Sequence, residues 1–162
     1  MPVVSSSRDL QALTMTFVAE FEAELEQVWQ LWADPRQLER WWGPPGYPAT
    51  FTRYEFMPGG ECRYHMTSPE GERFPAYWRI TSVDAPTGLE LEDGFADDSG
   101  EPRPEPATRM RMTLEPSGSR TRMTLASQFA STGQLEEMLK MGMEEGMRLA
   151  LGQIDDILAE VA

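Results

Sequence analysis

The feature that most constrains the fold is a change of hydrophobic periodicity near residue 130. Between residues 49 and 129, apolar and polar residues alternate in short runs separated by Gly, Pro, Asp and Ser, a pattern typical of antiparallel strands. From Ser131 to the C-terminus, apolar residues recur every three or four positions, as in an amphipathic helix capped at Ser131 or Thr132. A run of strands followed by one long helix predicts an α+β fold.

The segment before residue 49 adds one strand and two short helices. Alternation over 13–21 predicts a strand with one buried face. Helical spacing predicts a helix over 24–33, and Asp34-Pro35 separates it from a second short helix that runs towards Trp41. The remaining strands are expected at 50–56, 61–67, 73–83, 89–95, 108–114 and 121–129.

One helix cannot cover six or seven strands unless the sheet curls around it. We therefore expect a curved antiparallel sheet of six to seven strands wrapped around the long C-terminal helix, with an internal pocket where the two fail to meet. Residues 1–12 show no period and are expected to form a loose leader, and residues 13–162 are expected to form a single domain.

The charge and the single cysteine exclude several classes of function. The net charge of -13 would repel phosphate backbones, so nucleic acid is not an expected partner. The N-terminus does not resemble a secretion signal, and no apolar run is long enough for membrane insertion. Cys62 has no second cysteine to pair with, and we expect it to be a buried, unreactive thiol. These features favour a cytoplasmic protein.

Four common catalytic or nucleotide-binding motifs are absent. The chain lacks Gly-x-Ser-x-Gly, His-Glu-x-x-His, a phosphate-binding loop and Gly-x-Gly-x-x-Gly. Its one histidine, His65, follows Tyr64 in a strand, so the two side chains point to opposite faces. We expect no cofactor, no metal site and no catalytic residue.

Methionines and two glycines indicate where a ligand could lie. The chain has 11 methionines, several of them on the last helix, where Gly142 and Gly146 also stand. Glycine is unfavourable within a helix, so these two either let the helix approach the sheet closely or leave room for a ligand. The inward aromatic and methionine stripes can likewise be core packing or a cavity lining. The residues predicted to line the cavity are Trp29, Tyr64, Met66, Trp78, Met112, Met123, Met138, Gly142 and Gly146.

An ordered series of short motifs resembles a known family. The motifs are Val28-Trp29 with Trp32, Asp34-Pro35, Trp41-Trp42-Gly43-Pro44, Pro58-Gly59-Gly60, Gly94-Phe95-Ala96-Asp97, Thr121-Arg122-Met123-Thr124 and Met141-Gly142-Met143-Glu144-Glu145-Gly146. They are similar to the bacterial single-domain branch of the activator of heat shock protein 90 ATPase homologue-like family, within the START-like (SRPBCC) superfamily. The resemblance implies the helix-grip fold with an apolar cavity, but no single activity.

Three functions are considered. The first is binding of a small, apolar, aromatic or lipid-like molecule in the cavity, without catalysis. The second is a cofactor-independent cyclase or dehydratase of the polyketide type, with Tyr64 or Glu55 as acid or base. The third is a stress-related or chaperone-associated interaction module that exposes Trp41, Trp42 and Pro44-Pro45 to a protein partner. The alternative for the two tryptophans, which we favour, is that they pack against the sheet and close one end of the cavity.

Overall fold

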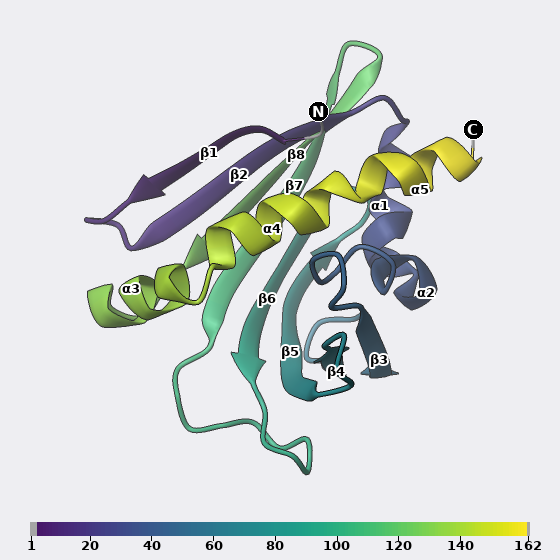
Figure 1. Ribbon diagram of the computed structural model, residues 1–162. Coiled ribbons are helices and arrows are strands. Elements are labelled where there is room, and N and C mark those ends of the chain that lie inside the picture. The colour runs from purple at the N-terminus through teal and green to yellow at the C-terminus, as the bar shows by residue number, and fades with distance from the viewer. Residues whose placement is uncertain (1–2, 162) are drawn as a thin grey trace.

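The computed structural model describes residues 3–161. Its strands form one open, curved antiparallel sheet of eight strands, in the order β1-β2-β8-β7-β6-β5-β4-β3 (Figure 1). Their bounds are β1 Val3–Asp9, β2 Thr14–Phe21, β3 Ala49–Tyr54, β4 Glu61–Thr67, β5 Arg73–Asp84, β6 Gly88–Phe95, β7 Thr108–Ser117 and β8 Arg120–Gln128. The predicted α+β class is confirmed, and each strand expected between residues 13 and 129 is present.

The first strand corrects the prediction for the N-terminal residues. Residues 1–12 were expected to form a loose leader, but β1 pairs antiparallel with β2, with Ser7 opposite Thr16. The sheet therefore has eight strands rather than six or seven. An edge strand such as β1 needs a backbone partner on one side only, so it can form without the alternating apolar residues that mark the other strands.

The two short helices follow β2, as predicted. In α1 (Leu25–Ala33), the Gln27 side chain accepts a hydrogen bond from the Glu24 backbone N–H, at 3.1 Å. In α2 (Pro35–Leu38), Asp34 accepts one from the Arg36 N–H, at 2.9 Å, while Pro35 occupies the first turn. Both contacts satisfy backbone groups that the start of a helix leaves unpaired.

The C-terminal helix is interrupted, whereas one continuous helix was expected. It consists of α3 (Thr132–Lys140), α4 (Met143–Gly152) and α5 (Ile154–Val161), which cross one face of the sheet end to end (Figure 1). Ser131 caps α3, as predicted. Gly142 separates α3 from α4 with φ of +83°, a left-handed conformation that glycine adopts without a steric penalty. None of the helices within residues 3–161 is long and apolar enough to cross a membrane.

One apolar core lies between the inner face of the sheet and the helices. The inward positions follow the predicted alternation, and the core joins strands β2 to β8 to buried residues of all five helices. Its largest fully buried side chains are Met15, Phe17, Phe21, Leu31, Trp32, Leu38, Trp41, Trp78, Ile80, Leu89, Leu91 and Met112.

Candidate functional site

The inner face of the sheet carries one carboxylate among its apolar residues. On β6, Leu89, Leu91 and Asp93 stand two positions apart and share this face. Asp93 lies directly opposite Trp78 of β5 in the strand register. From β4, the next strand beyond β5, the hydroxyl of Tyr64 donates a hydrogen bond to Oδ1 of Asp93, at 2.8 Å. Three adjacent strands thus bring a phenol and a carboxyl together.

Burial changes the acid–base behaviour of both groups. Loss of solvent raises the pKa of Asp93 to about 7, against a smaller opposing contribution from the Tyr64 hydroxyl and the Trp78 N–H. Burial also raises the pKa of Tyr64 well above its ordinary value, and the negative charge of Asp93 adds to the effect. Near neutral pH, Asp93 can therefore either donate or accept a proton, while Tyr64 stays protonated.

Two tryptophan N–H groups beside this pair have no acceptor. The indole nitrogens of Trp42 and Trp78 are buried, and neither finds a hydrogen-bond partner among residues 3–161. Both lie near enough to Tyr64 to lower its pKa, and Trp78 also lies near enough to Asp93 to lower that pKa, but neither has the geometry of a hydrogen bond. By contrast, Trp41 Nε1 donates to the Leu31 carbonyl at 3.0 Å. Trp42, Tyr64, Trp78 and Asp93 are together called the Tyr–Asp site below.

Aromatic rings surround the Tyr–Asp site. The Tyr64 ring stacks on Phe51 with centroids 4.8 Å apart, and its edge meets Trp78 at 6.0 Å. Trp42 and Trp78 meet edge to face at 5.0 Å. These rings exclude water from the carboxyl and the phenol, which is why both pKa values rise.

Exposed aromatic residues continue the inner face beyond the Tyr–Asp site. Phe95 follows Asp93 by two residues on β6 and pairs with Ala76, and Phe74 precedes Ala76 by two residues on β5. Phe74 and Phe95 are each 45% exposed. The ring of Tyr47 lies 6.5 Å from that of Phe74. Tyr47, Phe74 and Phe95 are called the aromatic rim.

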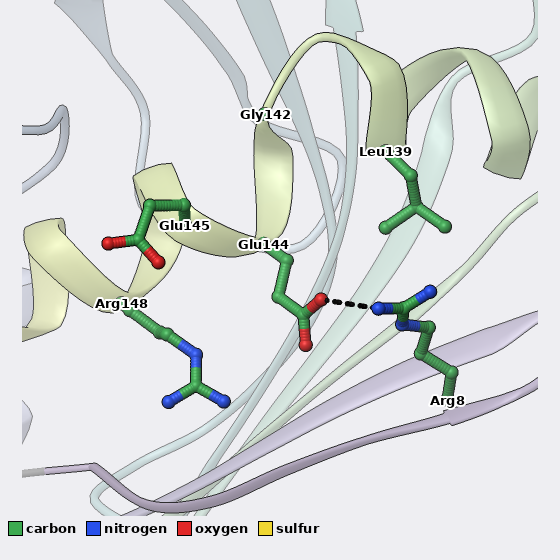
Figure 2. Close-up of a pocket in the computed structure, with 6 residues that line it drawn as sticks. All are labelled: Arg8, Leu139, Gly142, Glu144, Glu145 and Arg148. Atoms are coloured by element: carbon green, nitrogen blue, oxygen red, sulfur yellow. Dashed lines mark hydrogen bonds and ion pairs between the residues drawn. The ribbon is translucent and has the colours of Figure 1, made fainter.

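Two surface pockets are lined by residues other than those of the Tyr–Asp site. The larger, of about 430 Å³, lies between β1 and the α3–α4 junction and is lined mainly by charged residues (Figure 2). Figure 2 shows Arg8 reaching from β1 to Glu144 of α4, an ion pair of 2.9 Å. The second, of about 390 Å³, includes Glu92, Arg109 and Phe129. Neither is the predicted apolar cavity between sheet and helix, so that cavity stays a prediction.

The predicted cavity residues fall into separate groups. Tyr64, Met66 and Trp78 share the inner face of β4 and β5, next to Asp93. Met112 of β7 and Met123 of β8 are buried on the inner face of the sheet, where the Met123 sulfur accepts a hydrogen bond from the Trp32 N–H at 3.4 Å.

The other four predicted residues lie on the helices. Trp29 packs edge to face against Phe56, with centroids 5.6 Å apart. Met138 is partly buried against the core. A Cβ atom added at Gly142 or Gly146 would meet no atom within 4 Å, so close approach of helix to sheet does not explain either glycine. The left-handed backbone explains Gly142.

Two further expectations are decided by burial. Trp41 and Trp42 are buried, so the hypothesis that they form an exposed interaction patch is wrong. Their rings close against Trp32 at 4.8 and 5.9 Å. Cys62 is a buried free thiol, and burial raises its pKa to about 12, so it is unreactive, as expected.

Sequence reasoning missed Asp93 and the unpaired indoles. The signal for Asp93 was present, since Asp93 continues the alternation of Leu89 and Leu91 within the strand expected at 89–95. Glu55, considered as an acid or base, instead binds Arg53 at 2.9 Å and the Glu61 backbone N–H at 3.0 Å, on the exposed end of the sheet. No sequence pattern reports that an indole lacks an acceptor.

Comparisons with known proteins agree on the family. The family model described as "Activator of Hsp90 ATPase homolog 1-like protein" matches residues 22–159. A solution structure of a protein from Arthrobacter aurescens is 51% identical, with a TM-score of 0.94, and the match covers 98% of this chain and 92% of that one. A crystal structure from Mycobacterium smegmatis is 42% identical, with a TM-score of 0.90 and 97% of each chain covered.

The fold persists at lower identity. A solution structure from Staphylococcus epidermidis is 22% identical, with a TM-score of 0.85 and coverage of 98% of this chain and 96% of that one, and it supports the fold alone. None of the curated proteins matches the chain. The family model and the two closely similar structures together show that this chain belongs to the Activator of Hsp90 ATPase homolog 1-like family, with the START-like helix-grip fold.

Proposed function

We propose that the protein binds a small, mainly apolar molecule on the inner face of its sheet, with a polar group of that molecule at the Tyr–Asp site. The observation that carries the proposal is that two buried indole N–H groups, on Trp42 and Trp78, have no acceptor and lie beside the carboxyl of Asp93. A buried donor without a partner costs about 1–3 kcal/mol. An oxygen atom on a ligand would remove that cost.

The family supports the same class of function. The Activator of Hsp90 ATPase homolog 1-like family fits a ligand-binding domain for small hydrophobic molecules. Here the aromatic rings around Tyr64 would contact the apolar part of such a molecule, and the exposed Phe74 and Phe95 would be the first surface it meets. The site is therefore proposed to fill from the aromatic rim inward.

The experiment compares two adjacent tryptophans. Native mass spectrometry and thermal shift against a panel of lipids, fatty acids, flavonoids and aromatic polyketides should identify binders. Trp42→Phe removes an unpaired N–H, so it should weaken binding of the best ligand about tenfold. Trp41→Phe removes an N–H that bonds the Leu31 carbonyl, so it should lower stability and leave affinity unchanged. Absence of any binder, or equal affinity losses in the two variants, would refute the proposal.

A second candidate function is acid–base catalysis at the same site. It is favoured by one observation: two titratable side chains, Tyr64 and Asp93, converge within hydrogen-bond distance in apolar surroundings. Asp93, rather than Glu55, would be the proton acceptor, because its pKa of about 7 suits proton transfer near neutral pH. Asp93 would take a proton from the carbon next to a ligand carbonyl and return it.

Proton exchange provides the test of catalysis. In D₂O, a ketone that binds the site should gain deuterium next to its carbonyl faster with the wild-type protein than with Asp93→Asn. The variant keeps the size of the side chain and an oxygen that can accept from Tyr64. Equal exchange with both proteins, at ligand concentrations that saturate them, would leave binding as the only function.

A further inference from the structure

The polar groups of the Tyr–Asp site define what a ligand must offer. Asp93 Oδ1 accepts the Tyr64 hydroxyl, and among residues 3–161 no hydrogen bond reaches Asp93 Oδ2. Asp93 is partly exposed, unlike the buried Leu91 that precedes it on the same face. The site thus presents one free carboxyl oxygen and the two free N–H donors of Trp42 and Trp78.

On the basis of the proposed function, we propose that the ligand carries a neutral hydroxyl group at one end of an apolar body, and that Asp93 is the residue that selects it. A hydroxyl is both donor and acceptor. It can donate to the free oxygen of Asp93 and accept from an indole N–H of Trp42 or Trp78. Alcohols and phenols satisfy both sides of the site with a single atom.

Other oxygen-containing groups would form hydrogen bonds with only some of the polar atoms of the Tyr–Asp site. A ketone or an ether accepts from an indole N–H but leaves the Asp93 oxygen without a donor. A carboxylate would place a second negative charge beside Asp93 in apolar surroundings.

No cation at the site offsets that repulsion. Among the described residues of β4, β5 and β6, no inward position carries Lys or Arg. Arg63 and Arg79 alternate to the outer face, where they contact Glu61 and Glu92 at 3.6 and 3.3 Å. The site therefore discriminates against anions.

The aromatic rim sets the direction of the apolar body. Asp93 stands between the buried Leu91 and the 45% exposed Phe95 on the same face of β6. A hydroxyl at Asp93 would leave the rest of the molecule pointing along the face towards Phe95 and Phe74. Both rings are apolar, so they suit the apolar end of the ligand and add no charge to it.

Three probes on one scaffold test this selection. The probes are para-phenylphenol, para-methoxybiphenyl and para-phenylbenzoate, which present a hydroxyl, an ether and a carboxylate on the same pair of rings. Calorimetry at about pH 8 keeps Asp93 mostly ionised. The wild-type protein should bind the phenol roughly tenfold more tightly than the ether or the acid, since a hydrogen bond to a charged group is lost with either.

Decan-1-ol and decanoate repeat the comparison on an aliphatic body. The alcohol should again bind more tightly than the acid. Equal affinities for hydroxyl, ether and carboxylate would overturn the hydroxyl assignment and leave the proposed function standing. Failure of all five probes to bind would overturn the hydroxyl assignment, while binding of other molecules in the wider panel would still support the proposed function.

Two variants separate the role of Asp93 from a general change in charge. Asp93→Asn should reduce the preference for the phenol and strengthen binding of para-phenylbenzoate several-fold, because the repelling charge is gone. Glu92→Gln also replaces a carboxylate with an amide, one residue away on the outer face, where Glu92 pairs with Arg79. It should change neither the affinity for para-phenylphenol nor that for para-phenylbenzoate. An unchanged ranking in Asp93→Asn would overturn the assignment. The wild-type ranking tests it independently if that variant does not fold.

Discussion

The two ends of the inner face are packed differently. In α4 and α5, Ala150, Leu151, Ile154 and Ile157 are buried, and the Gln153 side chain donates to the Gly43 carbonyl at 2.8 Å. At the other end only Leu135 of α3 is buried, and the methionines and leucine that follow are partly buried. The closed end comprises Ala150, Leu151, Ile154, Ile157 and Leu158; the open end comprises Met138, Leu139, Met143 and Met147, with Asp93 and the aromatic rim.

Side-chain exposure also increases along the sheet, as it does along the C-terminal helices. Along β6, Leu89 and Leu91 are each 2% exposed, Asp93 is partly exposed and Phe95 is 45% exposed. The Gln134 side chain of α3 donates to the Pro106 carbonyl, so α3 lies beside the loop that follows β6. Branched aliphatic residues fix the closed end, while flexible methionines let the open end adapt to different shapes.

Truncating one leucine at each end should give the largest difference in the free energy of unfolding. Leu151→Ala removes a fully buried side chain and should lower the free energy of unfolding by about 2–5 kcal/mol. Leu139→Ala removes a partly buried one and should cost less than about 1 kcal/mol. Urea unfolding of the two variants measures both values. Similar losses would mean that the open end is as tightly packed as the closed end.

The charge of Asp93 should make the open end sensitive to pH. Its pKa is about 7 in the folded protein and near 3.8 when unfolded, so folding favours the protonated form. The contribution of Asp93 to the free energy of unfolding is therefore most favourable below about pH 4. It decreases as the pH rises and becomes constant above about pH 7. The loss should be about 2 kcal/mol, less than the full shift would give, because Asp93 is partly exposed.

Urea unfolding across this pH range measures that loss. Asp93→Asn cannot ionise and should remove the component, while Glu92→Gln should retain it. If the wild-type protein and Asp93→Asn changed in parallel with pH, Asp93 would be solvated like an ordinary surface carboxylate, and the open end would lack a buried charge.

The two glycines of the open end should respond in opposite directions. Gly142→Ala places a side chain on a left-handed backbone and should destabilise the protein by about 1–2 kcal/mol. Gly146→Ala lies within α4, where the added Cβ meets no atom, and should stabilise it by about 1 kcal/mol. Thermal unfolding of both variants checks the signs. Destabilisation by Gly146→Ala would indicate that this part of the helix lies closer to the sheet than the structure shows.

The sequence allowed most of the fold to be predicted, because burial of one sheet face imposes strict alternation. The strand expected at 61–67 is β4 with the same bounds. The strand β1 could not be predicted in this way, since it pairs through its backbone at the edge of the sheet. The break at Gly142 was hidden because apolar residues keep their helical spacing across it.

The candidate site was only partly predictable. Tyr64 and Trp78 followed from alternation, and Asp93 could have followed from the same rule applied one step beyond Leu91. The free N–H groups of Trp42 and Trp78 could not, because whether an indole finds an acceptor depends on the positions of atoms from other strands. Trp41 and Trp42 are adjacent and are both tryptophans, yet only Trp41 donates to a backbone carbonyl, that of Leu31.

The indole N–H signals of the tryptophans provide the most direct test of ligand binding at the Tyr–Asp site. They can be assigned by single Trp→Phe variants and followed by ¹H–¹⁵N NMR as para-phenylphenol is added. Binding at this site should move the signals of Trp42 and Trp78, because their free N–H groups gain an acceptor, and should leave that of Trp41, already bonded to Leu31, in place. Movement of the Trp41 signal alone, or of none, would contradict binding at the Tyr–Asp site.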